Sequence, residues 1–203
     1  MHNKTLIWAG ERGILTNGLA TTQALKLGSE IGELCTNLLT GKPIEDDVGD
    51  CLVVMTNLAD LQNLNLLECI APAVSEEDLI MNLIGQLGLL QDKVIKGQSV
   101  GAQLGQIVSI LELISYNTPL VECWELAYNE IKDRQGVLNK QGNFIKSTDS
   151  AYPLAQLEHL ADMPMTEIET LLKDGDSIDV HKPELTIDDI LGLLKDGYTA
   201  IPF

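Results

Sequence analysis

Four carboxylates near the start of the chain are the residues best suited to chemistry. They form two pairs, Glu30 with Glu33 and Asp47 with Asp50. Residues three apart lie on one face of a helix, so each pair projects both carboxylates in the same direction. The intervening Thr-Gly-Lys-Pro sequence of residues 40–43 predicts a helix–helix connection, because Gly ends helices and Pro fits poorly inside them.

A helical hairpin about this connection would bring the two pairs to the same level. Glu33 and Asp50 are each roughly eight residues from the turn, which is about 13 Å along a helix. Four acids gathered inside a hairpin repel one another unless a cation lies among them. Hard oxygen donors suit Mg²⁺ or Mn²⁺. The pattern therefore predicts a divalent metal site held by Glu30, Glu33, Asp47 and Asp50.

Two helices must position these acids. The first is expected from Thr21 or Thr22 to Leu39, where the polar residues Gln23, Lys26, Glu30, Glu33 and Asn37 follow one helical face. The second is expected from Glu45 to Leu61, with Asp47, Asp50 and Asn57 on one face. Its apolar run at residues 51–55 indicates a buried helix, and buried charges are costly unless they are paired or ligated.

These motifs resemble the MazG-like family of all-α nucleoside triphosphate pyrophosphohydrolases. The resemblance is carried by the Glu-x-x-Glu and Asp-x-x-Asp pairs and by the runs at residues 23–34 and 47–54. It extends to a second segment, Asn129-x-x-Lys132-x-Arg134, with Gly142 to Lys146 beyond it. The chain departs from the family at Asp47, where a Glu is usual, so either Glu45 or Asp46 could contribute in its place.

The resemblance implies Mg²⁺-dependent hydrolysis of a (deoxy)nucleoside triphosphate to the monophosphate and pyrophosphate. One of Glu30 and Glu33 would act as the catalytic base, and the four acids would hold the metal. Lys26, Lys132 and Arg134 would neutralise the triphosphate. The other substrate contacts expected are Asn129 and, at the nucleoside, Gln23, Asn57 or Trp8. Trp8 has a second interpretation, as a core aromatic.

The chain also contains an internal repeat. With a shift of 56 positions, Gly32, Gly41 and Gly49 fall on Gly88, Gly97 and Gly105. The same shift places Glu30, Glu33, Asp47 and Asp50 on Gln86, Leu89, Gln103 and Gln106. The pair Glu68-Cys69 matches Glu122-Cys123 with a shift of 54, but only the second is followed by Asn129, Lys132 and Arg134. We therefore expect a fused pseudo-dimer, with acids from the first repeat and cations from the second.

Composition limits the classes of partner. The net charge of −17 argues against nucleic acid and anionic membranes. No signal sequence or stretch of 18 apolar residues is present, so we expect a cytoplasmic protein. Cys35, Cys51, Cys69 and Cys123 lack metal-ligand spacing and are expected to be reduced, buried thiols.

The expected organisation is an all-α helical domain at residues 1–148, with repeats at about 19–70 and 78–134, and an acidic helical extension at 149–203. Residues 5–18 are expected to form a short leading segment and loop. Residues 166–175 and 186–197 each predict a short capped helix, with a role in structure, oligomerisation or partner binding. A homodimer is expected from the family resemblance. The alternative function is a non-catalytic nucleotide sensor or helical scaffold.

Overall fold

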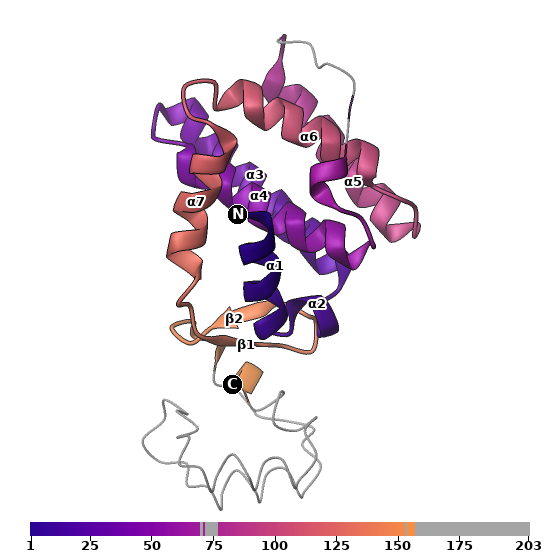
Figure 1. Cartoon of the computed structure of the whole chain (residues 1–203), viewed down its shortest axis with the longest axis vertical. Helices are drawn as coiled ribbons and strands as arrows, with labels where there is room; N and C mark the ends of the chain where they lie inside the picture. The colour runs from indigo at the N-terminus through magenta and orange to yellow at the C-terminus, as the bar shows by residue number, and fades with distance from the viewer. Residues whose placement is uncertain (70, 72–76, 153, 157–203) are drawn as a thin grey trace, which may run out of the picture.

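The computed structural model describes residues 1–69, 71, 77–152 and 154–156. Two helical hairpins form its centre (Figure 1). The first joins α3 (Ala20–Thr40) to α4 (Glu45–Leu61), and the second joins α5 (Leu79–Ile95) to α6 (Gly101–Ile114). Helix α3 packs on α4 and α5, and α4 also packs on α6. The all-α fold class predicted from the sequence is confirmed.

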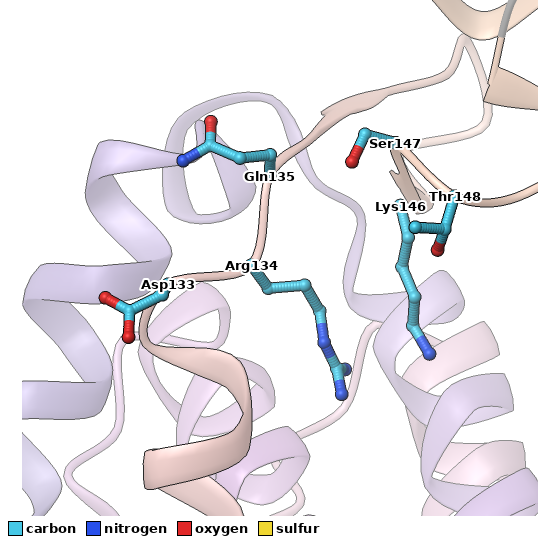
Figure 2. A pocket seen from close by; sticks show the side chains of 6 residues that line it. All are labelled: Asp133, Arg134, Gln135, Lys146, Ser147 and Thr148. Carbon is cyan, nitrogen blue, oxygen red and sulfur yellow. The ribbon is translucent and has the colours of Figure 1, made fainter.

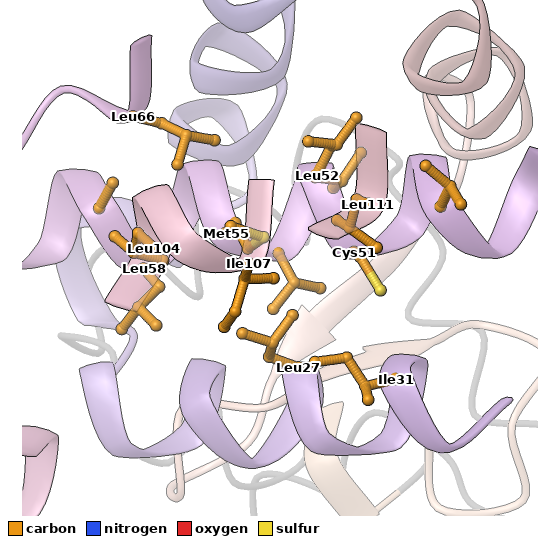
Figure 3. Close-up of a cluster of buried hydrophobic side chains, with 14 of the residues drawn as sticks. Leu27, Ile31, Cys51, Leu52, Met55, Leu58, Leu66, Leu104, Ile107 and Leu111 are labelled. Atoms are coloured by element: carbon orange, nitrogen blue, oxygen red, sulfur yellow. The ribbon is translucent and has the colours of Figure 1, made fainter. Parts of the chain in front are cut away.

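Helix α4 is the central element of the bundle. Every residue from Cys51 to Ala59 is buried, and the helix contacts α1, α3, α6 and α7 (Leu120–Ile131). Figure 3 shows side chains of α3, such as Leu27 and Ile31, pointing at Cys51 and Met55 of α4. Burying apolar side chains of this size makes the main favourable contribution to the stability of the fold. The acids of α4 therefore lie next to an apolar core.

The first hairpin has the bounds and turn that the sequence predicts. Helix α3 ends at Thr40, and Gly41 adopts a left-handed conformation with φ of 67°. Its N–H donates to the carbonyls of Asn37 and Leu38, and the N–H of Lys42 donates to Asn37 O at 3.0 Å. These bonds satisfy the last carbonyls of the helix, as a C-terminal Gly cap requires.

The start of the chain differs from the prediction. Residues 5–18 were expected to be mainly loop, but α1 spans His2–Glu11 and α2 spans Ile14–Asn17. Thr5, Trp8 and Ala9 are the buried residues of α1, a spacing that matches one helical face. The hydroxyl of Thr5 accepts a hydrogen bond from Trp124 Nε1 at 3.0 Å, so a polar residue lies on the buried side.

A β-hairpin follows α7, and the sequence did not predict it. Strand β1 (Gly136–Leu138) pairs antiparallel with β2 (Phe144–Lys146), with Val137 opposite Ile145. The hairpin lies against the lower ends of α1 and α2 (Figure 1), where the Phe144 ring meets Trp8 with centroids 6.1 Å apart. Thr22 Oγ1 donates to Gln141 O at 2.7 Å, which ties the hairpin loop to α3.

The four cysteines are free thiols. Cys51 and Cys123 are buried, as expected, whereas Cys35 and Cys69 are only half-buried. A short 3-10 helix, η1 (Leu66–Glu68), follows α4. No helix among the described residues is long and apolar enough to cross a membrane. The two short helices predicted at residues 166–175 and 186–197 lie outside the described residues.

Candidate functional site

Helices α3 and α4 place three acids against one another. Glu30 on α3 is buried, with 5% of its surface exposed, and it forms an i,i+4 ion pair with Lys26. Burial raises the pKa of Asp50 on α4 to about 7, and the negative charges of Glu30 and Asp46 contribute to that rise. Lys26 and Arg134 lower the pKa of Asp50. A half-buried carboxylate whose pKa is raised by burial and by neighbouring negative charges lies where a cation would be stabilising.

The third acid of this cluster is Asp46, which the sequence offered only as a substitute for Asp47. Burial raises the pKa of Asp46, as do the charges of Glu130, Asp47 and Glu30, while Arg134 lowers it. Its Oδ1 is buried and has no hydrogen-bond partner among the described residues. A buried, unpaired carboxylate oxygen is costly and is suited to receive a ligand.

Asp47 and Glu33 lie differently from the prediction. Asp47 Oδ2 accepts a hydrogen bond from Asn37 Nδ2 at 2.8 Å, which ties α4 to α3 near the turn. Glu33 is exposed on α3, whereas Glu30, one turn earlier, is buried. Within the described ranges, no three Asp, Glu, His or Cys side chains form a ready-made metal-binding group. The predicted quartet is therefore not gathered as a ligand set.

Helix α7 packs closely against α4, next to the acids, because residue 49 is a glycine without a side chain. A Cβ at position 49 would lie 2.1 Å from the carbonyl oxygen of Cys123 and 2.8 Å from the Cβ of Ala127, so the two backbones touch beside Asp50. The second hairpin has a corresponding contact, since a Cβ at Gly105 would lie 2.9 Å from the carbonyl oxygen of Cys69. This crossing brings the end of α7, and with it Arg134, to the acid cluster.

Trp8 of α1 and Arg12, the residue that follows this helix, hold the end of α7 in place. Trp8 Nε1 donates to Ile131 O at 2.8 Å. Arg12 donates to Lys132 O at 2.8 Å through Nη2 and to Arg134 O at 3.1 Å through Nε. The Arg12 guanidinium also lies 4.9 Å from the centre of the Trp8 ring, where a cation–π contact is favourable. These bonds fix the backbone from which the Arg134 side chain extends.

The structure supports the core interpretation of Trp8 and not the nucleobase lid. Its side chain is buried, with 7% exposed, and its N–H is already bonded to Ile131. A lid must present a free ring face to the ligand, whereas this ring is covered by Arg12 and Phe144.

The remaining predicted substrate residues fall into two groups. Gln23 and Asn57 are buried, with 6% and 2% exposed, and Asn57 Oδ1 has no hydrogen-bond partner among the described residues. Lys132 and Asn129 are exposed at the end of α7, where Lys132 Nζ donates to Asn129 Oδ1 at 3.3 Å. Only the second group is open to a ligand from solvent.

A surface pocket of about 440 Å³ adjoins the end of α7. It is lined by Asp133, Arg134, Gln135, Lys146, Ser147 and Thr148. Figure 2 shows the Arg134 and Lys146 side chains extending in the same direction, with Asp133 pointing away from them. The pocket thus combines two cations with two hydroxyls, groups that bind phosphate oxygens.

Sequence reasoning missed Arg12 and Glu130 and assigned no role to Lys146. The first two become visible only when α1 and α7 are placed beside α4, because neither residue belongs to a motif. Lys146 lies within the segment that resembles the family. It is far from the acid pairs in the sequence, so the sequence does not indicate that it lies beside Arg134.

The comparisons add one relative. A protein described as an uncharacterized 18.2 kDa protein in the rep-hol intergenic region of Haemophilus phage HP1 is 29% identical over 148 residues. The match covers 59% of this chain and 91% of that protein, and its description names no activity. No family model and no solved structure matches the chain.

Proposed function

We propose that the protein is a Mg²⁺-dependent hydrolase that converts a (deoxy)nucleoside triphosphate to the monophosphate and pyrophosphate. The observation that carries this proposal is the cluster of Glu30, Asp46 and Asp50 on α3 and α4, in which Glu30 is buried and the two aspartates are half-buried, with the charge of Arg134 acting on both aspartates. Acids held together at the edge of a core, with a cation from another helix next to them, suit a metal–polyphosphate ligand.

The donor atoms at this site fit a hard divalent cation. The unpartnered Oδ1 of Asp46 and the carboxyl of Asp50, with a pKa of about 7, are oxygen ligands of the kind that Mg²⁺ prefers. Glu30, Asp46 and Asp50 would hold the ion, with Glu33 and Asp47 beside them. Bound there, Mg²⁺ would polarise a phosphoryl oxygen and offset its charge.

The chain's own residues would position the reactants. The oxygen of a water molecule would bond to the α-phosphorus while the bond from that phosphorus to its bridging oxygen breaks, so that pyrophosphate leaves. Glu33 or Glu30 would accept the proton that the water releases. Arg134, Lys132 and Lys26 would neutralise the non-bridging oxygens, with Lys26 also retaining its pairing to Glu30.

We also propose that the two hairpins are repeats that have specialised. Several of their fully buried positions coincide under the shift of 56, since Leu27, Leu34 and Val48 correspond to Leu83, Leu90 and Leu104, all at 0% exposure. The close contacts are reciprocal as well: Gly49 faces Cys123, and its counterpart Gly105 faces Cys69. Both features are expected of two units related by an approximate two-fold axis.

We also propose that the protein forms a homodimer. Helix α5 exposes the apolar side chains of Met81, Ile84, Leu89 and Ile95, and a large exposed apolar face often marks an interface. Sedimentation velocity would measure the oligomeric state directly.

One observation favours a second function, a nucleotide sensor or scaffold without turnover. The described residues contain no preassembled group of three metal ligands, so the acids could serve to bind without supporting catalysis. Turnover separates the two functions, whereas metal or nucleotide binding is expected for both the enzyme and the sensor.

The test is pyrophosphate release from a panel of ribo- and deoxynucleoside triphosphates, with Mg²⁺ and with EDTA. Wild type, Glu33→Gln and Glu112→Gln are run in parallel, the last as a matched loss of one exposed carboxylate on α6. We expect Mg²⁺-dependent release that Glu33→Gln lowers by on the order of 10²-fold and Glu112→Gln preserves. If folded protein releases no pyrophosphate from any substrate, the enzymatic function is rejected and the sensor or scaffold function is favoured.

A further inference from the structure

We propose that the pocket between the end of α7 and β2 is an anion site that receives the terminal phosphates of the substrate, with Lys146 as its second cation. The inference rests on the proposed function and names the part of the substrate that becomes the leaving pyrophosphate. Nothing in the sequence motifs assigned Lys146, Ser147 or Thr148 a role.

The lining groups have the chemistry of a phosphate site. Arg134 and Lys146 project together into the same space, and Asp133, the acid among the lining residues, points away from both (Figure 2). Ser147 and Thr148 add hydroxyl donors at the same wall. Two cations and two hydroxyls offer charge-assisted hydrogen bonds to a pyrophosphate group, which has several anionic oxygens.

The backbone of the pocket is formed before any ligand arrives. Ser147 N donates to Gln135 O at 2.9 Å, and Lys146 pairs with Gly136 across the β-hairpin. On the other side, Arg12 donates to the carbonyls of Lys132 and Arg134. A site held in its bound shape loses little conformational entropy when it binds a ligand.

The location of the pocket suits a substrate that spans two sites. Arg134 lines the pocket and follows α7, the helix whose backbone touches α4 next to Asp50 at Gly49, so the pocket adjoins the acid-bearing hairpin. A triphosphate with its α-phosphate at the acids would extend its β- and γ-phosphates past Arg134 toward Lys146. The strongly acidic protein would thereby offer a local positive site for the leaving group.

The experiment is a titration with inorganic pyrophosphate by calorimetry in Mg²⁺ buffer, using wild type, Lys146→Gln, Lys146→Arg and Lys96→Gln. Lys96→Gln is the matched control because Lys96 is also exposed and forms an ion pair with surface Asp92 at the end of α5. We expect Lys146→Gln to weaken binding roughly tenfold, the loss of one charge-assisted contact. Lys146→Arg should restore most of the affinity, and Lys96→Gln should leave it unchanged.

Two results would overturn this assignment. One is a Lys146→Gln affinity equal to that of wild type and Lys96→Gln, and the other is no binding of pyrophosphate by folded wild type. The proposed function fails separately: pyrophosphate binding that depends on Lys146, in a protein that hydrolyses no triphosphate, would keep the pocket and remove the enzyme. If the wild type hydrolyses a triphosphate and Lys146→Gln keeps full affinity for pyrophosphate, the enzyme stands and the pocket assignment fails.

Discussion

The two helical hairpins, which we propose to be repeats, differ in the side chains at the positions that match under the shift of 56. In α3–α4 the positions beside the core hold Glu30, Asp47 and Asp50, and in α5–α6 the corresponding positions hold Gln86, Gln103 and Gln106. The Gln side chains carry no charge, so the second hairpin does not bear the cost of burial and of neighbouring negative charge that raises the pKa of Asp50 to about 7. We propose that the acids of α3–α4 serve a ligand, because the matching positions of the second hairpin hold no acid.

The largest expected effect comes from exchanging one residue between the hairpins. Glu30→Gln copies the amide of the second hairpin, and we expect it to reduce triphosphate turnover by on the order of 10³-fold, because loss of metal-assisted stabilisation costs several kcal/mol. The reciprocal change, Gln86→Glu, should leave turnover unaltered. Steady-state rates of both variants, with circular dichroism as a folding control, check this prediction. Equal effects of the two changes would contradict it.

A second difference is in the response to pH. The pKa of Asp50 is about 7 in the folded protein, above its ordinary value of 3.8, so the folded state binds more protons than the unfolded chain between these values. The stabilising contribution of Asp50 is therefore complete below about pH 4 and is lost as the pH rises through about 7. A shift of this size corresponds to up to about 4 kcal/mol in the free energy of unfolding.

Denaturant unfolding in EDTA, from pH 4 to pH 8, measures this dependence. Asp50→Asn should gain stability relative to wild type as the pH rises, because the amide does not titrate. Gln106→Asn, the corresponding change in the second hairpin, should follow the wild-type pH dependence at a constant offset. Parallel curves for wild type and Asp50→Asn would contradict the raised pKa.

The smallest of these effects tests the reciprocal close contacts. Gly49→Ala should destabilise the protein by about 3 kcal/mol, because its Cβ would overlap the backbone of α7. Gly105→Ala should cost less, since the new Cβ lies 2.9 Å from Cys69 O. Gly32→Ala is the control: a Cβ there meets nothing within 4 Å and should stabilise α3 by roughly 0.5–1 kcal/mol. Thermal unfolding ranks the three variants, and an unchanged Gly49→Ala would refute the close crossing.

The sequence predicted the acid-bearing hairpin well because its signals are local. The Gly41 stop and the apolar run of α4 depend on nearby residues only, and both helices have nearly the predicted bounds. Helix α1 was missed because one of its buried positions is Thr5, whose polarity is satisfied by distant Trp124. The β-hairpin was missed because its strands have three residues each, too few to show a period of two.

The site was predicted in part for a similar reason. Spacing along α4 identifies Asp46, Asp47 and Asp50 as neighbours, but the rotation of the helix about its axis decides which two face Glu30. That rotation is set by packing against α3 and α7, with Gly49 at the closest point. Lys146 joins Arg134 only because the β-hairpin folds back beside the end of α7.

The central claim is that water attacks the α-phosphorus of a nucleoside triphosphate. Reaction in ¹⁸O-labelled water with Mg²⁺, followed by mass spectrometry of the products, tests it most directly. We predict that the label enters the nucleoside monophosphate and that the pyrophosphate is unlabelled, with no product in EDTA. Label in the pyrophosphate, release of orthophosphate and a diphosphate, or no product from folded protein would contradict the account.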